Sequence, residues 1–314
     1  MISVAVTARA FSNSVVLRKE LLKRYPDAKF NEEGTQLSGV DLISYLQGCE
    51  KAIIALEIID DKILSALPKL KVISKFGVGL DNLDLPAFTR RKINLGWAPG
   101  VNKRSVSELA LSFMLALSRN VFKTSHQLKQ GVWNKSGGHN LSNKIIGLIG
   151  VGHIAKDLIQ LLKPFGCKIL VNDIVDQSAF YKQQGVKEVS FDQLITQSDI
   201  VSLHVSKTSK TVNMINEHVL KKMKSSAYLI NTSRGDVVDQ NALKQALIKE
   251  EIAGAAVDVY HDEACIDESF LQLPNLIATP HIGGNAYEAV LAMGRAAIVG
   301  LDNVVNINNL QGKY

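Results

Sequence analysis

The chain has 314 residues, of which 46% are hydrophobic and 21% charged, with a formal net charge of +6. This length favours two domains, and the composition excludes a disordered or fibrous protein. No apolar run approaches the roughly 18 residues of a membrane span. Residues 1–7 have the pattern of a strand, without the basic leader and long apolar core of a signal peptide.

The cationic excess is compatible with either a nucleic acid or a small anionic ligand. Its short groups, Arg90–Lys92 and Lys221–Lys224, lack interleaved aromatic residues and are typical of solvated faces, so we expect no nucleic-acid partner. The three cysteines, Cys49, Cys167 and Cys265, are far apart and form no CxxC motif. They predict reduced thiols, hence a cytoplasmic protein without a metal site.

Residues 1–97 alternate between strand and helix patterns, which predicts a parallel sheet with crossover helices. The expected strands are Ile2–Thr7, Lys51–Leu56, Leu70–Lys75 and Ile93–Ala98, and the expected helices are Val15–Leu22 and Asp60–Leu67. Ligands of open α/β sheets bind beyond the carboxyl ends of strands. The glycine-containing stretch after Lys75 is therefore either an anion site, using the backbone N–H groups of Val78 and Gly79, or a plain turn.

A long apolar segment, Val106–Leu117, predicts a buried helix at the crossing into a second domain, and a further helix is expected over His126–Trp133. The alternation then resumes in six strands with intervening helices, which indicates a doubly wound dinucleotide domain. These strands are Lys144–Ile149, Lys168–Asn172, Ile200–Val205, Ala227–Asn231, Ala253–Val257 and Leu276–Ala278. The helical tail, Tyr287 to about Val305, is expected to return to the first domain.

The first of these six strands ends in Gly150-x-Gly152-x-x-Ala155, and an amphipathic helix follows. Gly150 permits a tight turn, Gly152 leaves room for a pyrophosphate, and Ala155 lets the helix lie close to the strand. The helix N-terminus adds free N–H groups and a partial positive charge. Asp173, at 173 − 152 = 21 residues after Gly152, is placed to bind a ribose diol and would repel a 2′-phosphate. The pattern predicts an NAD site.

Three later strand ends carry polar residues: Arg234, Glu263 and His281. Each has an ordinary alternative, as a surface cation, a solvated acid and a capping or core histidine. Together with a nicotinamide they supply what hydride transfer to a 2-oxo acid requires. Histidine can give the carbonyl oxygen a proton, a carboxylate orients the imidazole, and arginine binds a carboxylate in a planar fork.

The motifs Asn231-Thr-Ser-Arg234-Gly, Asp258-Val-Tyr-x-x-Glu263 and Thr279-Pro-His281-Ile-Gly-Gly, with the glycine motif, resemble those of the D-isomer-specific 2-hydroxyacid dehydrogenases. Upstream, Gly77-Val-Gly79-Leu-Asp-Asn82 and Ala98-Pro-Gly-Val-Asn102 extend the likeness to nearly the whole chain. The resemblance implies an NAD-dependent enzyme, usually a homodimer. It also implies a Rossmann NAD domain (residues 99–285) inserted in a flavodoxin-like substrate domain (residues 1–98 and 286–314).

By this resemblance, the catalytic residues are Arg234, Glu263 and His281. The implied substrate-binding residues are Lys75, Val78, Gly79, Asn102, Arg234 and His281. The implied cofactor-binding residues are Val106, Gly150, Gly152, His153, Ile154, Asp173, His204, Val205, Thr232, Ser233, Arg234, Asp258, His281, Gly283 and Gly284.

The stretch around Lys75 is most similar to that of 3-phosphoglycerate dehydrogenases, where a basic residue helps to hold the substrate phosphate. The resemblance therefore puts 3-phosphoglycerate and serine biosynthesis first, although Glu57 stands where a second arginine is expected and would repel a phosphate. The alternatives are a glyoxylate/hydroxypyruvate or D-lactate-type reductase and, in another class, an NAD-sensing corepressor-like binding protein. In each enzyme reading the partner is a small anionic acid.

Overall fold

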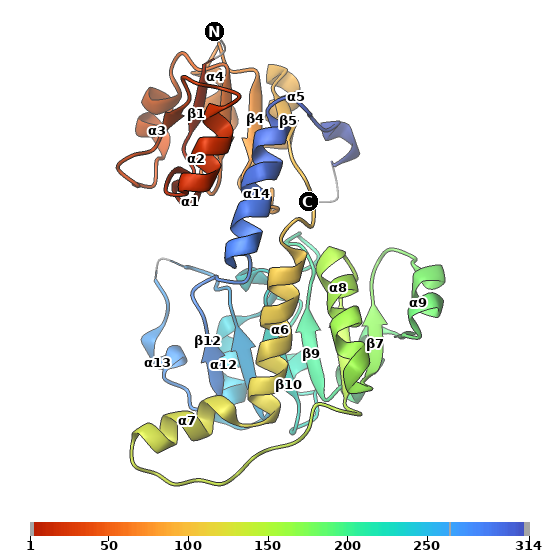
Figure 1. Ribbon diagram of the computed structural model, residues 1–314. Coiled ribbons are helices and arrows are strands. Elements are labelled where there is room, and N and C mark those ends of the chain that lie inside the picture. Colours follow the sequence, from red (N-terminus) through yellow and green to blue (C-terminus); the bar gives the residue numbers. More distant parts are fainter. Residues whose placement is uncertain (1–2, 264, 311–314) are drawn as a thin grey trace. The chain divides into compact units, whose positions relative to one another are not determined.

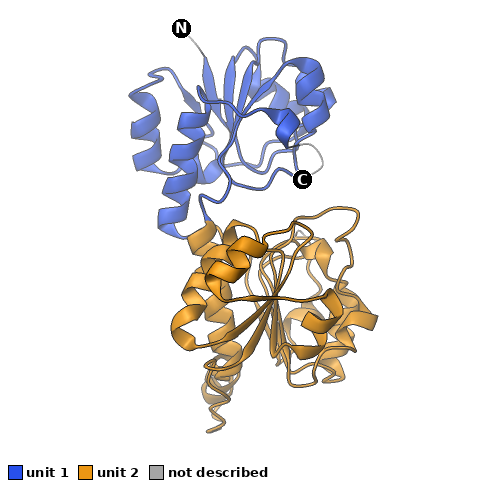
Figure 2. Cartoon of the chain, turned by 90° about the vertical axis from the view of Figure 1, so that its right-hand side faces the viewer, with its two compact units in different colours: residues 1–102, 285–314 blue, residues 103–284 orange. Residues whose placement is uncertain are grey.

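The computed structural model describes residues 3–263 and 265–310. The chain forms two compact units (Figure 2): unit 1 comprises residues 1–102 and 285–314, and unit 2 comprises residues 103–284. Unit 2 is thus inserted in the sequence of unit 1. The sequence predicts these two crossings at 98/99 and 285/286.

Unit 1 is built on a five-stranded parallel sheet in the order β2-β1-β3-β4-β5. Its strands are β1 (Val4–Val6), β2 (Lys29–Phe30), β3 (Lys51–Ile54), β4 (Val72–Lys75) and β5 (Asn94–Gly96). Its helices are α1 (Arg9–Ser12), α2 (Val15–Leu22), α3 (Gly39–Leu46), α4 (Asp61–Ser65), α5 (Leu85–Arg91) and α14 (Tyr287–Gly300), followed by the 3₁₀ turn η3 (Ile307–Asn309). The strand order is that of flavodoxin-like sheets.

Helices cover both faces of this sheet. The core under one face takes apolar side chains from α1, α2 and α14, and the core under the other takes them from α3, α4 and α5. In Figure 1, α14 runs beside α2 although the two are far apart in the sequence. Gly294 makes this possible, because a Cβ there would lie 2.5 Å from Leu17 Cδ2. The tail therefore belongs to unit 1.

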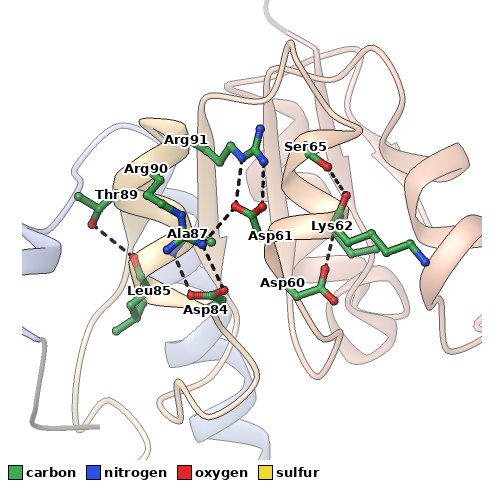
Figure 3. A network of polar contacts seen from close by, with 11 residues as sticks. Asp60, Asp61, Lys62, Ser65, Asp84, Leu85, Ala87, Thr89, Arg90 and Arg91 are labelled. Carbon is green, nitrogen blue, oxygen red and sulfur yellow. Dashed lines mark hydrogen bonds and ion pairs between the residues drawn. The ribbon is translucent and has the colours of Figure 1, made fainter.

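An ionic network joins α4 and α5 on the surface of unit 1 (Figure 3). The Asp60 and Asp84 carboxylates cap these helices by accepting first-turn N–H groups at 2.8 and 2.9 Å. The Asp61 carboxylate forms ion pairs with Arg91 at 2.8 Å and with Arg90 at 3.3 Å. All these side chains are exposed enough for solvent to screen them, so the caps contribute more to stability than the ion pairs do.

Unit 2 contains a seven-stranded parallel sheet in the order β12-β11-β10-β9-β6-β7-β8. Its strands are β6 (Ile145–Ile149), β7 (Lys168–Asn172), β8 (Lys187–Glu188), β9 (Ile200–Leu203), β10 (Tyr228–Asn231), β11 (Gly254–Val257) and β12 (Leu276–Ala278). Read from β8, this is the Rossmann order with one further strand, and the order reverses between β6 and β9. Ligands of such sheets bind at the carboxyl ends beside that reversal.

Helices again lie on both faces: α6 and α8 contribute to one core of unit 2, and α10 to α12 to the other. The helices and turns of unit 2 are α6 (Lys103–Ser118), α7 (Val121–Lys129), α8 (His153–Leu162), η1 (Lys163–Phe165), α9 (Ser178–Gln184), α10 (Phe191–Gln197), α11 (Glu217–Leu220), η2 (Gly235–Val237), α12 (Gln240–Ile248) and α13 (Glu268–Leu271). The predicted class, two doubly wound parallel sheets, is confirmed. In the part of the chain that the structure describes, no helix is long and apolar enough to cross a membrane.

Several sequence-based assignments need correction. The helix expected over His126–Trp133 begins earlier, at Val121, and ends at Lys129, because Gly131 adopts φ +81° and the Val132 N–H turns back to the Gln127 carbonyl. The edge strands β2 and β8 and the helices α1, α3, α5, α9 and α13 were not predicted. The first residue of the strand predicted from Ile2 lies outside the described residues.

Candidate active site

The glycine turn after β6 has the geometry that a dinucleotide requires. Gly150 has φ +84°, and a Cβ there would lie 2.7 Å from His204 O and 2.8 Å from Val205 Cγ1. Gly152 caps α8, and nothing lies within 4 Å of where its Cβ would be. The first N–H groups of α8 are thus accessible to an anion with no side chain in the way.

Asp173 lies beside this turn, directly after β7. Its Oδ2 accepts the Val151 N–H at 2.5 Å, and its Oδ1 accepts the Val175 N–H at 2.8 Å. Gln177 Nε2 donates to the Val151 carbonyl at 3.1 Å and reaches Asp173 Oδ2 at 3.4 Å. The carboxylate is therefore fixed next to the phosphate-binding turn. Sequence reasoning missed Gln177, which belongs to no recognisable motif.

Two neighbouring strand ends carry buried polar atoms without a hydrogen-bond partner among the described residues: His204 Nδ1, after β9, and Thr232 Oγ1, after β10. His204 Nε2 is 2.9 Å from Ser202 Oγ, and burial lowers the pKa of His204 to about 4. The imidazole is therefore neutral at physiological pH. Buried polar atoms of this kind are usually satisfied by a ligand or an ordered water. With the open glycine turn and Asp173, they fit NAD.

The acid–base pair is formed in unit 2. His281 Nδ1 lies 2.7 Å from Glu263 Oε1, and the two side chains are 45% and 49% exposed. This contact orients the imidazole and directs Nε2 away from the carboxylate. His281 also has φ +53°, a left-handed conformation that non-glycine residues seldom adopt. Such backbone strain is frequent at functional sites.

Asp258 holds the loop that carries His281. The carboxylate is buried and accepts three hydrogen bonds, from Thr279 Oγ1 at 2.6 Å, Ile282 N at 2.8 Å and Gly283 N at 2.7 Å. Burial raises the pKa of Tyr260 to about 12, so its hydroxyl stays protonated and donates to the Thr279 carbonyl at 2.9 Å. Asp258, which we predicted to line the NAD site, thus also determines where His281 stands.

Arg234 follows β10 in an extended conformation at the start of η2. Asn231 stabilises this loop: its Nδ2 donates to the Arg234 carbonyl at 2.9 Å, and its Oδ1 accepts the Ser233 N–H at 3.0 Å. Arg234 Nη1 contacts the Ser233 carbonyl at 2.8 Å. A Cβ on Gly235 would overlap the backbone of Tyr260, so glycine lets this loop lie against the loop that leads to Glu263.

The remaining residues predicted for the cofactor site also belong to unit 2. Val106, in α6, is buried, and its Cγ1 lies 3.7 Å from where a Cβ on Gly283 would be. Ser105 Oγ donates to the Gly283 carbonyl at 2.5 Å. His153 begins α8, and burial, Lys103 and Lys156 lower its pKa. The other predicted residues lie at the same strand and helix ends: Ile154, Val205, Ser233 and Gly284.

The other predicted substrate residues belong to unit 1. Lys75, the last residue of β4, is buried, and its Nζ donates to Asn82 Oδ1 at 2.7 Å and to the Ala55 carbonyl. Asn82 Nδ2 donates to the Ala55 and Glu57 carbonyls at 3.2 and 2.5 Å. The buried Glu57 carboxylate accepts the Ala55 N–H at 2.6 Å. This network joins the ends of β3 and β4.

The loop with Val78 and Gly79 follows β4, and Trp97 Nε1 donates to the Val78 carbonyl at 3.0 Å. Asn102 Oδ1 is buried without a hydrogen-bond partner among the described residues. The structure thus gathers Lys75, Val78 and Gly79 at one end of the unit 1 sheet, and Arg234, Glu263 and His281 on strand-end loops of unit 2. Residues 3–263 and 265–310 contain no group of three or more metal-ligating side chains that could hold a metal ion.

The chain is similar to known proteins over most of its length. The family profile "D-isomer specific 2-hydroxyacid dehydrogenase, NAD binding domain" matches residues 111–283. A glyoxylate reductase from Thermococcus litoralis is 38% identical over 240 residues, which cover 74% of this chain and 72% of that protein. A D-3-phosphoglycerate dehydrogenase from Mycobacterium leprae is 34% identical over 233 residues, covering 74% of this chain and 44% of that protein.

Among solved structures, a D-lactate dehydrogenase from Aquifex aeolicus, in complex with NAD and lactic acid, superposes with a TM-score of 0.83 at 26% identity. The match covers 95% of this chain and 93% of that one. The fold and the sequence therefore point to one family, while the relatives differ in the acid that they are named for.

Proposed function

The chain belongs to the D-isomer-specific 2-hydroxyacid dehydrogenases, and on that basis we propose that it reduces a small, unphosphorylated 2-oxo acid with NADH. It is an NAD-dependent oxidoreductase whose substrates are 2-hydroxy or 2-oxo acids. Glyoxylate and hydroxypyruvate are the first candidates. This choice differs from the order that the sequence suggested, in which 3-phosphoglycerate came first, and it rests on the surroundings of Lys75.

Lys75 is the cation that a substrate phosphate would need, and it is already bound. Its ammonium group donates to Asn82 Oδ1 and to the Ala55 carbonyl inside a buried network. The buried Glu57 carboxylate is part of the same network. A phosphate would have to break hydrogen bonds of Lys75 and approach a carboxylate, and each lost bond of this charged kind costs about 1.5–3 kcal/mol. An unphosphorylated acid meets neither obstacle.

The proposed roles in catalysis follow from the geometry of unit 2. His281, with Nδ1 on Glu263, is placed to give a proton from Nε2 to the carbonyl oxygen of the substrate. Glu263 stabilises the charged imidazolium before the transfer and holds its orientation. Arg234 binds the substrate carboxylate and stabilises charge that develops on the carbonyl oxygen. Bound NADH supplies the hydride.

In the same proposal, the backbone N–H groups of Val78 and Gly79 bind the substrate carboxylate. The contact from Trp97 Nε1 to the Val78 carbonyl supports this role, because it keeps the loop in one conformation. NAD is held by the glycine turn, by Asp173 and by the strand ends at His204 and Thr232.

The substrate proposal is tested by following NADH oxidation with glyoxylate, hydroxypyruvate, pyruvate and 3-phosphohydroxypyruvate. We expect kcat/KM to be highest for one of the unphosphorylated acids. Preference for 3-phosphohydroxypyruvate would overturn the substrate and make serine biosynthesis the better reading, as the phosphoglycerate dehydrogenase relatives would also suggest. The catalytic proposal is tested by His281→Asn, which should lower turnover by a factor on the order of 10² or more with NADH binding retained.

We further propose that the protein is a cytoplasmic homodimer in which α7 contacts a second copy. No residue of α7 is buried, and the apolar side chains of Phe122, Leu128 and Trp133 are exposed on it and just after it. Exposed apolar groups of this kind mark interaction surfaces. Light scattering should give the mass of a dimer for the native chain and of a monomer for Phe122→Ser combined with Trp133→Ser. A native monomer would contradict the proposal.

A further inference from the structure

One carboxylate joins three of the loops at the carboxyl edge of the unit 2 sheet. Asp236 lies in η2, two residues after Arg234. Its Oδ2 is 2.9 Å from Lys207 Nζ, in the loop after β9, and its Oδ1 is 3.0 Å from His261 Nδ1, in the loop after β11. His261 in turn lies two residues before Glu263. Asp236 therefore connects segments that carry residues of the proposed cofactor and catalytic sites.

The backbone supports the same arrangement. The Asn213 N–H donates to the Asp236 carbonyl at 2.8 Å, and an isolated parallel bridge pairs Ile215 with Val238, so the segment after β9 lies along η2. On the other side, the loop of Gly235 lies directly against the backbone of Tyr260. The three loops are thus in contact through main-chain atoms. The Asp236 carboxylate adds side-chain contacts to Lys207 and His261.

Charge and burial favour this role. The Asp236 side chain is only 17% exposed, whereas Lys207 and His261 are 45% and 73% exposed. Burial by itself raises the pKa of Asp236, but Lys207 and then His261 outweigh it, and the net direction is downward. The carboxylate is therefore ionised at neutral pH. An ionised, mostly buried group depends on its partners more than an exposed one does.

We propose that Asp236 is a positioning residue: by binding Lys207 and His261, it fixes the position of Arg234 relative to the Glu263–His281 pair. This inference rests on the proposed function of Arg234 and His281. Hydride and proton transfer require the substrate carboxylate and carbonyl to be held together in one orientation. A displacement of about 1 Å in such a site can cost about 10²-fold in rate. Asp236 itself touches neither substrate nor cofactor in this scheme.

The test compares Asp236→Asn with Glu217→Gln, which removes one carboxylate charge from an exposed i,i+4 pair on α11. We expect Asp236→Asn to lower kcat/KM for the 2-oxo acid roughly 10- to 100-fold, with NADH affinity by fluorescence titration changed less than about threefold. Glu217→Gln should leave both values within about twofold. His261→Gln should reproduce part of the loss, and the double variant should lose less than the product of the single effects.

Three outcomes are informative. The inference is supported if kcat/KM falls while NADH binding stays intact, and if the effects of the Asp236 and His261 substitutions on kcat/KM are not additive. A lowered melting temperature with unchanged kcat and KM would mean that Asp236 only stabilises the fold, and would overturn it. If His281→Asn retained native turnover, the proposed function itself would fail, and that variant is measured separately so that the two failures are distinguished.

Discussion

Asp258→Asn is the substitution for which the structure allows the most definite prediction. The carboxylate is 1% exposed and accepts hydrogen bonds from Thr279 Oγ1, Ile282 N and Gly283 N. All three donors belong to the loop around His281. Asparagine has nearly the same shape but replaces one acceptor oxygen with an NH₂ group, which has no lone pair for an N–H donor. Shape and burial are therefore preserved while hydrogen bonding changes.

The expected loss follows from which oxygen is replaced. If the amide oxygen takes the place of Oδ1, the bonds from Thr279 and Ile282 remain, and the NH₂ group faces Gly283 N. If the amide is turned, the Ile282 bond is lost and the Thr279 hydroxyl has to accept from the NH₂ group instead of donating. One N–H donor loses its acceptor in either orientation, and because a hydrogen bond to a charged group contributes about 1.5–3 kcal/mol, the free energy of unfolding should fall by about that amount.

Urea unfolding followed by circular dichroism measures this loss, and NADH oxidation measures its effect on the His281 loop. Asp192→Asn is a suitable control, because the Asp192 carboxylate is exposed in its ion pair with Lys222 and its loss should change stability by less than about 0.5 kcal/mol. Activity of Asp258→Asn should fall even at saturating substrate. Loss of less than about 1 kcal/mol together with native kcat would refute the role of Asp258 as the acceptor that orders this loop.

Two further predictions concern the cofactor side of unit 2. Burial lowers the pKa of His204 to about 4, below its ordinary value of about 6.5. The neutral imidazole therefore contributes stability that is complete above pH 6.5 and is lost as the pH falls towards 4. At pH 5 the free energy of unfolding measured in urea should be lower by about 2 kcal/mol, and His204→Gln should remove that part of the pH dependence. Gly150→Ala should abolish measurable NADH binding, because φ +84° and the 2.7 Å distance to His204 O leave no room for a methyl group. Gly185→Ala, the control, should leave NADH affinity unaffected. Native NADH affinity in Gly150→Ala would contradict the assigned turn.

The regular part of the fold could be predicted because its strands are short apolar runs bounded by turn residues. The strand β2 could not, because it has only two residues, and neither could β8, whose two residues, Lys187 and Glu188, are both exposed. The position of β8 is determined by pairing with β7 rather than by any apolar pattern of its own. The end of α7 was misplaced for a related reason. A left-handed glycine at 131 ends the helix locally, whereas the apolar residues around it suggested that it continued.

For the site, the sequence could indicate residue types and strand ends but not hydrogen-bond partners. The motif around Asp258 indicates a cofactor contact, and the structure adds that the same carboxylate orders the His281 loop. Gln177 and Asp236 belong to no pattern that a single sequence reveals, because their importance comes from which loops meet in three dimensions. Spacing along the chain carries no information about such contacts between separate strand ends.

Glu57 shows how a correct observation can support a different conclusion once the contacts are known. On the sequence it was an isolated acidic residue that would repel a substrate phosphate. In the structure its carboxylate accepts a hydrogen bond from the Ala55 N–H, and the Ala55 carbonyl accepts one from Lys75. Both side chains are therefore held by hydrogen bonds within one buried network, Glu57 through the Ala55 N–H and Lys75 through the Ala55 carbonyl and Asn82. The proposed preference for an unphosphorylated acid follows from this network, because an additional anionic group would have to break its hydrogen bonds at the ends of β3 and β4 to bind Lys75.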